Sequence, residues 1–131
     1  MFPCNFNEEH PQVEGLNGIL DVYKTAIKRV QLFGPTNFAP IIRQVASFAK
    51  SGQECREGKK YFVLLILTDG IITDMQETKR AIVENSGFPF SIIIVGVGGA
   101  DFDDMCELDA KETLLTCQVL MLGNIHNFTS G

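Results

Sequence analysis

The chain has 131 residues, of which 45% are hydrophobic, and its formal net charge is −5 at pH 7. This length and apolar fraction are typical of one domain with a hydrophobic core. The acidic balance argues against a nucleic-acid surface and against a polybasic membrane patch. The chain has no run of about 18 apolar residues that would predict a membrane span, and its first residues do not resemble a signal peptide.

The cysteines and histidines argue against a zinc site. The chain has two histidines and four widely spaced cysteines that form no CxxC pair, namely Cys4, Cys55, Cys106 and Cys117. Because no secretion signal is visible, we expect reduced thiols in a cytosolic protein. The glycosylation sequon at residues 127–129 is then expected to have no role.

The N-terminal part predicts two helices. Residues 1–13 are polar and predict an irregular lead-in. Apolar residues then recur at helical spacing between residues 16 and 30, which predicts an amphipathic helix. Residues 34–37, Gly-Pro-Thr-Asn, predict a loop before a second helix that carries Pro40 in its first turn. The apolar side of this second helix is expected to hold Ile41, Val45, Phe48 and Ala49.

The remainder of the chain alternates between apolar runs and helical signals. The run 61–67 shows no alternation, which predicts a strand covered on both faces, and a second strand is predicted over 90–97. Between them, Thr73 predicts the start of a third helix with Gln76 as its capping-box partner. A short helix that Asp101 caps and that runs to Leu108, and a further strand from Val119 to Leu122, complete the expected elements.

Strands that alternate with amphipathic helices predict an α/β fold, an open and mostly parallel sheet with helices on both faces. We expect a single domain over residues 1–131. Ligands of such sheets bind beyond the carboxyl ends of the strands. The loops after Leu67 and Val97 are therefore the ones to examine for a site.

Two residues in loops could hold a divalent cation. Asp69 follows a predicted strand in Thr68-Asp69-Gly70, and Thr36 lies in the loop before the second helix. A carboxylate and a hydroxyl are hard oxygen donors suited to Mg²⁺ or Mn²⁺. The alternative is that Asp69 caps a turn and Thr36 caps a helix, which is the more frequent use of these residue types.

Other motifs do not predict catalysis. Residues 96–101, Gly-Val-Gly-Gly-Ala-Asp, lack the third glycine of a dinucleotide fingerprint, and the acid in its place would repel a pyrophosphate. The acidic residues between 101 and 109 lack the spacing of a calcium loop and predict a solvated helix face. His10 and His126 have no visible triad partner, and the chain contains no GxSxG elbow, P-loop or kinase motif. We therefore expect no enzyme and no catalytic residues.

Three stretches of the chain resemble the copine family. They are VQLFGPTNFAPII at residues 30–42, LLILTDGIITDM at 64–75 and SIIIVGVGGADF at 91–102. The resemblance runs from about residue 5 to about residue 109. It implies a von Willebrand factor A-type fold with a metal-ion-dependent adhesion site, in which Thr36 and Asp69 match the threonine and the aspartate of the metal site. In such a site the metal keeps one position open for an acidic side chain of a partner.

The chain departs from the family pattern in two places. It contains no DxSxS motif, which the family carries after its first strand. The resemblance thus implies that the first strand is missing and that Mg²⁺ or Mn²⁺ binds weakly. Residues 110–131 also differ from the aromatic, Val-Pro-rich end that the family has, and are expected to form a divergent C-terminal segment.

The resemblance implies a cytoplasmic protein-binding module that recruits target proteins bearing an acidic contact residue and that binds no nucleic acid. Ca²⁺ and membrane phospholipid would bind to other domains of the parent protein, which would move to the plasma membrane when calcium rises and act in membrane trafficking and signalling. Two alternatives stay open. The first is a phosphoryl-transfer enzyme on the same fold. The second is an inactive fragment whose unpaired strand edges favour aggregation.

Overall fold

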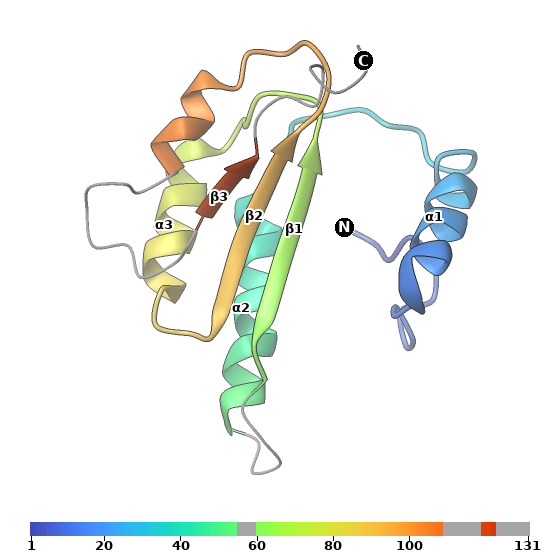
Figure 1. The fold of residues 1–131 in the computed structure, drawn as a ribbon, viewed down its shortest axis with the longest axis horizontal. Helices are drawn as coiled ribbons and strands as arrows, with labels where there is room; N and C mark the ends of the chain where they lie inside the picture. The colour runs from blue at the N-terminus through green and yellow to red at the C-terminus, as the bar shows by residue number, and fades with distance from the viewer. Residues whose placement is uncertain (55–59, 109–118, 123–131) are drawn as a thin grey trace, which may run out of the picture. The chain divides into compact units, whose positions relative to one another are not determined.

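The computed structural model describes residues 1–54, 60–108 and 119–122, which belong to two compact units, residues 1–34 and residues 35–131. The first unit contains helix α1 (Gly15–Ala26). The second unit contains α2 (Ala39–Glu54), β1 (Phe62–Thr68), α3 (Met75–Asn85), β2 (Phe90–Gly96), the 3₁₀ helix η1 (Asp103–Leu108) and β3 (Val119–Leu122) (Figure 1). Among these helices, none is long and apolar enough to cross a membrane.

In the first unit, α1 ends earlier than its apolar periodicity predicts. The helix ends at Ala26, and after the amide of Ile27 the spacing of the bonds shortens: Lys28 N donates to Thr25 O and Arg29 N donates to Ala26 O. The pattern of apolar residues continues to Val30 in a turn. Four large apolar side chains of the helix are exposed, those of Leu16, Ile19, Leu20 and Tyr23.

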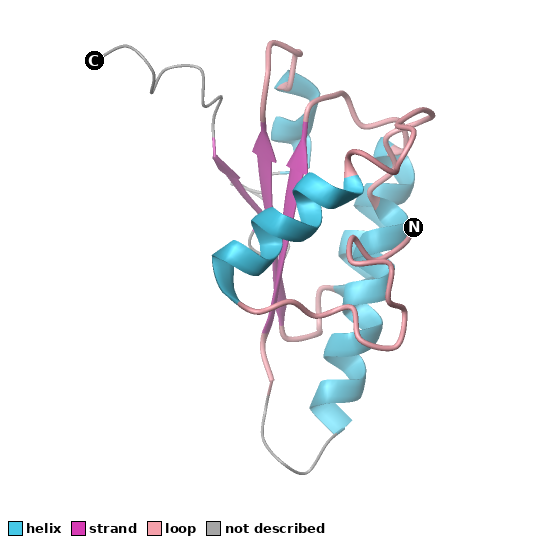
Figure 2. Cartoon of the chain, turned by 90° about the vertical axis from the view of Figure 1, so that its right-hand side faces the viewer, coloured by secondary structure: helices cyan, strands magenta, loops and turns pink. Residues whose placement is uncertain are grey.

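The second unit is built on a parallel sheet in the order β1-β2-β3 (Figure 1), and Figure 2 shows its strand arrows pointing the same way. β1 pairs with β2 from Phe62 opposite Phe90 to Thr68 opposite Gly96. β2 pairs with β3 over residues 119–122, so the last predicted strand is confirmed. Because the strands are parallel, their carboxyl ends lie at one edge of the sheet. The open parallel sheet and its helices confirm the α/β class.

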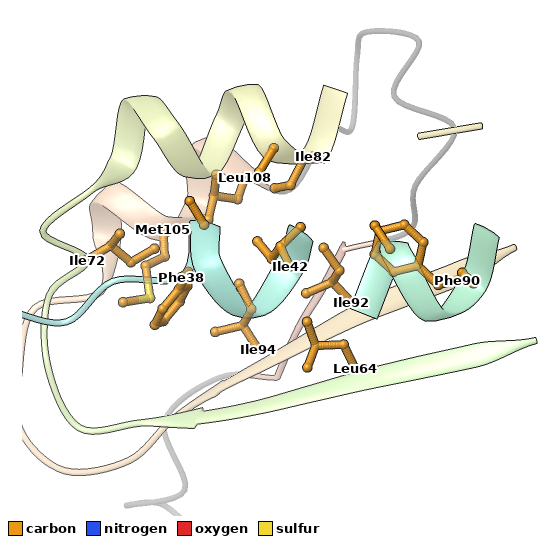
Figure 3. Packing of buried hydrophobic residues seen from close by; sticks show 14 residues of the cluster. Phe38, Ile42, Leu64, Ile72, Ile82, Phe90, Ile92, Ile94, Met105 and Leu108 are labelled. Carbon is orange, nitrogen blue, oxygen red and sulfur yellow. The ribbon is translucent and has the colours of Figure 1, made fainter. Parts of the chain in front are cut away.

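The core lies between the sheet and the helices α2, α3 and η1 (Figure 3). Its largest fully buried apolar side chains are Ile42, Ile82, Ile92, Ile94, Met105 and Leu108. Full burial of one such side chain stabilises a fold by about 1.5–3 kcal/mol. On α2 the buried apolar residues are Ala39, Ile42, Ala46 and Ala49, whereas Phe48 of the predicted apolar side is exposed. The helix is therefore rotated slightly from the orientation that its sequence predicts.

β1 is covered on one face, where the uninterrupted apolar run predicted cover on both. Leu64 is 9% exposed and belongs to the core, while the next residue, Leu65, is 55% exposed. Val63 and Leu67 share the exposed face with Leu65. The physical reason is that α2, α3 and η1 pack on the face of Leu64 (Figure 3), and in the described part of this unit no helix covers the other face.

One helix start differs from its prediction. α3 begins at Met75, and the Thr73 hydroxyl accepts a hydrogen bond from a distant backbone amide in place of forming a capping box. Asp101 accepts a hydrogen bond from Asp103 N at 2.9 Å at the start of the 3₁₀ helix that ends at Leu108, so the predicted cap of this short helix is confirmed. The sequon, Cys55, Cys117 and the divergent segment apart from β3 lie outside the described residues.

Candidate functional site

The loops after β1 and β2 leave the same edge of the sheet. Val97 N donates to Thr68 O at 2.8 Å, which continues the pairing one residue past the strands. Asp69 follows at once and is exposed. Gly70 N lies 3.4 Å from the buried Thr68 hydroxyl, so the turn bonds to Thr68. The Asp69 carboxylate therefore faces solvent at the edge where parallel sheets bind ligands.

Thr36 lies against the same loop. Its backbone forms two hydrogen bonds with Thr73: Thr36 N donates to the Thr73 hydroxyl at 2.9 Å, and Thr73 N donates to Thr36 O at 2.8 Å. A methyl group placed on Gly70 would lie 3.8 Å from Thr36 Oγ1. The Thr36 hydroxyl is thus next to the residue that follows Asp69, and both predicted site residues lie at one edge of the sheet.

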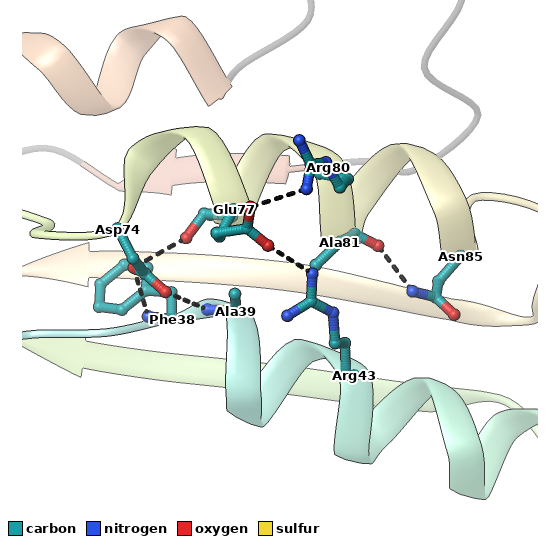
Figure 4. Close-up of polar contacts among 9 residues, drawn as sticks. Phe38, Ala39, Arg43, Asp74, Glu77, Arg80, Ala81 and Asn85 are labelled. Carbon is teal, nitrogen blue, oxygen red and sulfur yellow. Dashed lines mark hydrogen bonds and ion pairs between the residues drawn. The ribbon is translucent and has the colours of Figure 1, made fainter.

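The start of α2 is capped by a residue from another part of the chain (Figure 4). Phe38 N and Ala39 N donate to the two oxygens of Asp74 at 2.9 and 3.0 Å, and the Thr78 hydroxyl donates to Asp74 Oδ1 at 3.1 Å. Hydrogen bonds to a charged carboxylate are stronger than neutral ones, and a helix start favours negative charge. Because these amides bond to Asp74, they are not capped by Thr36, which the alternative interpretation of the sequence predicts as the cap.

Sequence reasoning missed Asp74. Its only local signal is an acidic residue directly before a helix, which is common at helix starts and points to the helix that follows. In the structure, Asp74 makes no side-chain cap to α3 and bonds instead to amides more than 30 residues earlier. Spacing along the sequence contains no sign of this contact.

A second polar group links α2 with α3 away from the sheet edge (Figure 4). Glu77 accepts hydrogen bonds from Arg43 of α2 and Arg80 of α3, each at 2.9 Å. The bond from Arg43, followed by the charge of Arg80, lowers the pKa of Glu77, and the same bond raises the pKa of Arg43. Exposed pairs of this kind contribute little to stability. The Arg43–Glu77 pair joins the surfaces of α2 and α3, and the Arg80–Glu77 pair lies within α3.

The donors at the sheet edge fit Mg²⁺ or Mn²⁺ in type. Mg²⁺ usually keeps several water ligands and takes one or two carboxylates from the protein. Asp69 would supply a carboxylate and Thr36 a hydroxyl, which leaves the rest of an octahedral shell for water or a partner. Among the residues that the structure describes, no three His, Cys, Asp or Glu side chains group together as a metal site. The pair therefore fits a weak site.

Comparison with known protein families gives a match over nearly the whole chain. The family model described as Copine matches residues 1–128. The match includes the loop of Thr36, the turn of Asp69 and the parallel strands that bring them to one edge. The chain belongs to the copine family.

Proposed function

We propose that this chain is a protein-binding module that recruits target proteins through a divalent cation held by Thr36 and Asp69. One observation carries the proposal: the Thr36 hydroxyl lies next to the Asp69-Gly70 turn, at the carboxyl edge of a parallel sheet. Thr36 would bind the ion directly, and Asp69 would bind it directly or through water. The bound cation would offer an open coordination position to an acidic side chain of the partner.

The place of this module in the cell is part of the proposal. In the intact parent protein, other domains would bind Ca²⁺ and phospholipid, and would move the module from the cytoplasm to the plasma membrane when calcium rises. The module would then bring its targets to the membrane, in signalling or trafficking. The proposed role of the cation is to bind a partner and not to catalyse a reaction. A cation with an open coordination position binds a carboxylate of the partner without any covalent bond being broken.

Cation binding can be tested on the 131-residue chain. Mn²⁺ is titrated by electron paramagnetic resonance and Mg²⁺ by calorimetry, for the wild type and for Thr36→Val and Asp69→Asn. Each variant is expected to weaken binding about tenfold, which corresponds to about 1.4 kcal/mol. Asp21→Asn is the matched control, because it removes the same charge from an exposed position of α1. Unchanged affinity in both site variants, or no saturable binding by the wild type, would overturn the assignment.

Recruitment needs a second experiment. A short peptide with a single glutamate is added to the chain with Mg²⁺ or with EDTA, and the same peptide with glutamine serves as the control. The proposal expects binding of the glutamate peptide that requires Mg²⁺ and that Asp69→Asn weakens. Equal binding of both peptides, or binding that EDTA leaves intact, would contradict a partner contact through the cation.

A further inference from the structure

Four hydrogen bonds tie the backbone of residues 36–39 to Thr73 and Asp74, three through side-chain oxygens and one through the Thr73 amide. Thr36 exchanges two of them with Thr73, and the amides of Phe38 and Ala39 give one each to Asp74. All four lie between 2.8 and 3.0 Å. This contact between residues 36–39 and residues 73–74 is called the loop clamp below.

We infer that Thr73 and Asp74 are positioning residues for the cation site. Thr36 precedes α2 and lies in no helix or strand, so its place depends on what its backbone bonds to. The loop clamp supplies those bonds. The cation ligand Asp69 and the clamp residues belong to the same loop, residues 69–74 between β1 and α3. One short loop therefore carries one proposed ligand at its start and holds the other ligand in place at its end.

The consequence for cation binding rests on the proposed function. Residues behind the direct ligands orient them, and their substitution typically weakens metal affinity 10- to 100-fold. The loop clamp also predicts coupling in the other direction. If the clamp favours the geometry that binds the ion, the ion must favour the clamp by the same factor. Added cation should therefore slow hydrogen exchange at the clamped amides.

Substitution of Thr73 distinguishes a positioning role from the role of an ordinary helix cap. Asp74 caps α2 as well as holding the segment, so its loss has two effects. The Thr73 hydroxyl instead bonds to Thr36 itself. Thr73→Val removes that acceptor without a change of charge and with little change of shape, and Thr73→Ser keeps the hydroxyl. This pair isolates the contact from both electrostatics and helix stability.

The experiment measures hydrogen exchange at the Thr36 amide without metal, and then Mn²⁺ and Mg²⁺ affinity, on the 131-residue chain. Thr73→Val is expected to speed exchange at Thr36 about tenfold and to weaken the cation at least about tenfold. Thr73→Ser should restore both values. Glu77→Gln is the matched control on α3, since its bonds go to Arg43 and Arg80, and it should alter neither value.

The outcomes separate this inference from the proposed function. Unchanged exchange in Thr73→Val, or faster exchange with unchanged cation affinity, would overturn the positioning role while the cation site stands. A wild-type chain that binds no cation would overturn the proposed function and the inference together. Should Thr73→Val fail to fold, Asp74→Asn tests the clamp at the amides of Phe38 and Ala39 together with the cap of α2, and faster exchange there with unchanged cation affinity would overturn the positioning role.

Discussion

Two neighbouring leucines of β1 provide a sharp test of the one-sided cover of the sheet. Leu64 is 9% exposed, and its removal by Leu64→Ala leaves a cavity between sheet and helices. Leu→Ala changes in a core lower the free energy of unfolding by about 2–5 kcal/mol, and we expect about 3 kcal/mol for Leu64→Ala. Leu65 is 55% exposed. Its truncation forfeits under half of the usual burial and encloses no cavity, so Leu65→Ala should cost at most about 1 kcal/mol.

The assay is urea unfolding of the 131-residue chain and both variants, followed by far-ultraviolet circular dichroism. The free energy of unfolding should fall about 2 kcal/mol further for Leu64→Ala than for Leu65→Ala. An unchanged m value in both variants shows that the comparison concerns stability alone. Equal losses, or a larger loss for Leu65→Ala, would refute the reasoning, because they would mean that the second face of β1 is also buried.

Two further predictions concern the end of β2 and the helix pair. Gly96→Ala should destabilise the chain by about 1–2 kcal/mol in the same urea assay, because its new methyl would lie 3.0 Å from the Phe102 ring. Gly99→Ala, which meets no atom within 4 Å, should shift stability by less than about 0.5 kcal/mol, and equal effects would contradict the packing. The hydrogen bond from Arg43 lowers the pKa of Glu77 in the folded chain, so the unfolded chain binds a proton at Glu77 more readily. The contribution of ionised Glu77 to stability is therefore complete above the ordinary pKa of 4.5, and it is lost as pH falls through the lower pKa of the folded chain. Glu77→Gln should flatten that part of the acid unfolding curve, and identical curves would argue against the contribution.

Much of the fold follows from the sequence because its strands are strongly apolar. The runs that became β1 and β2 are bounded by Lys60, Asp69 and Gly98, and local composition is enough to locate them. Local composition does not predict whether one face or both faces of a strand are covered. Leu64 and Leu65 are the same residue type, so only the positions of the helices distinguish them.

The placement of Asp69 at the carboxyl end of β1 follows from the sequence for a similar reason. The carboxyl ends of parallel strands meet at one edge of the sheet, where ligands bind. Once the strand is identified, the residue that follows it is therefore expected at that edge. The role of Thr73 could not be found this way. Its hydroxyl has a plausible local use as a helix cap, and the structure gives it to an amide 37 residues earlier. Local hydrogen-bond signals do not distinguish these uses.

The capping of α2 by Asp74 also limits how an acidic partner can approach. The amino end of a helix normally attracts anions, because its first amides have no partner within the helix. Here the amides of Phe38 and Ala39 already bond to a carboxylate of the chain itself, and Pro40 has no N–H to offer. An incoming carboxylate would meet an occupied and negatively charged position there. The Asp74 carboxylate thus disfavours a second carboxylate at the start of α2, which leaves the proposed cation at the sheet edge as the contact for an acidic partner.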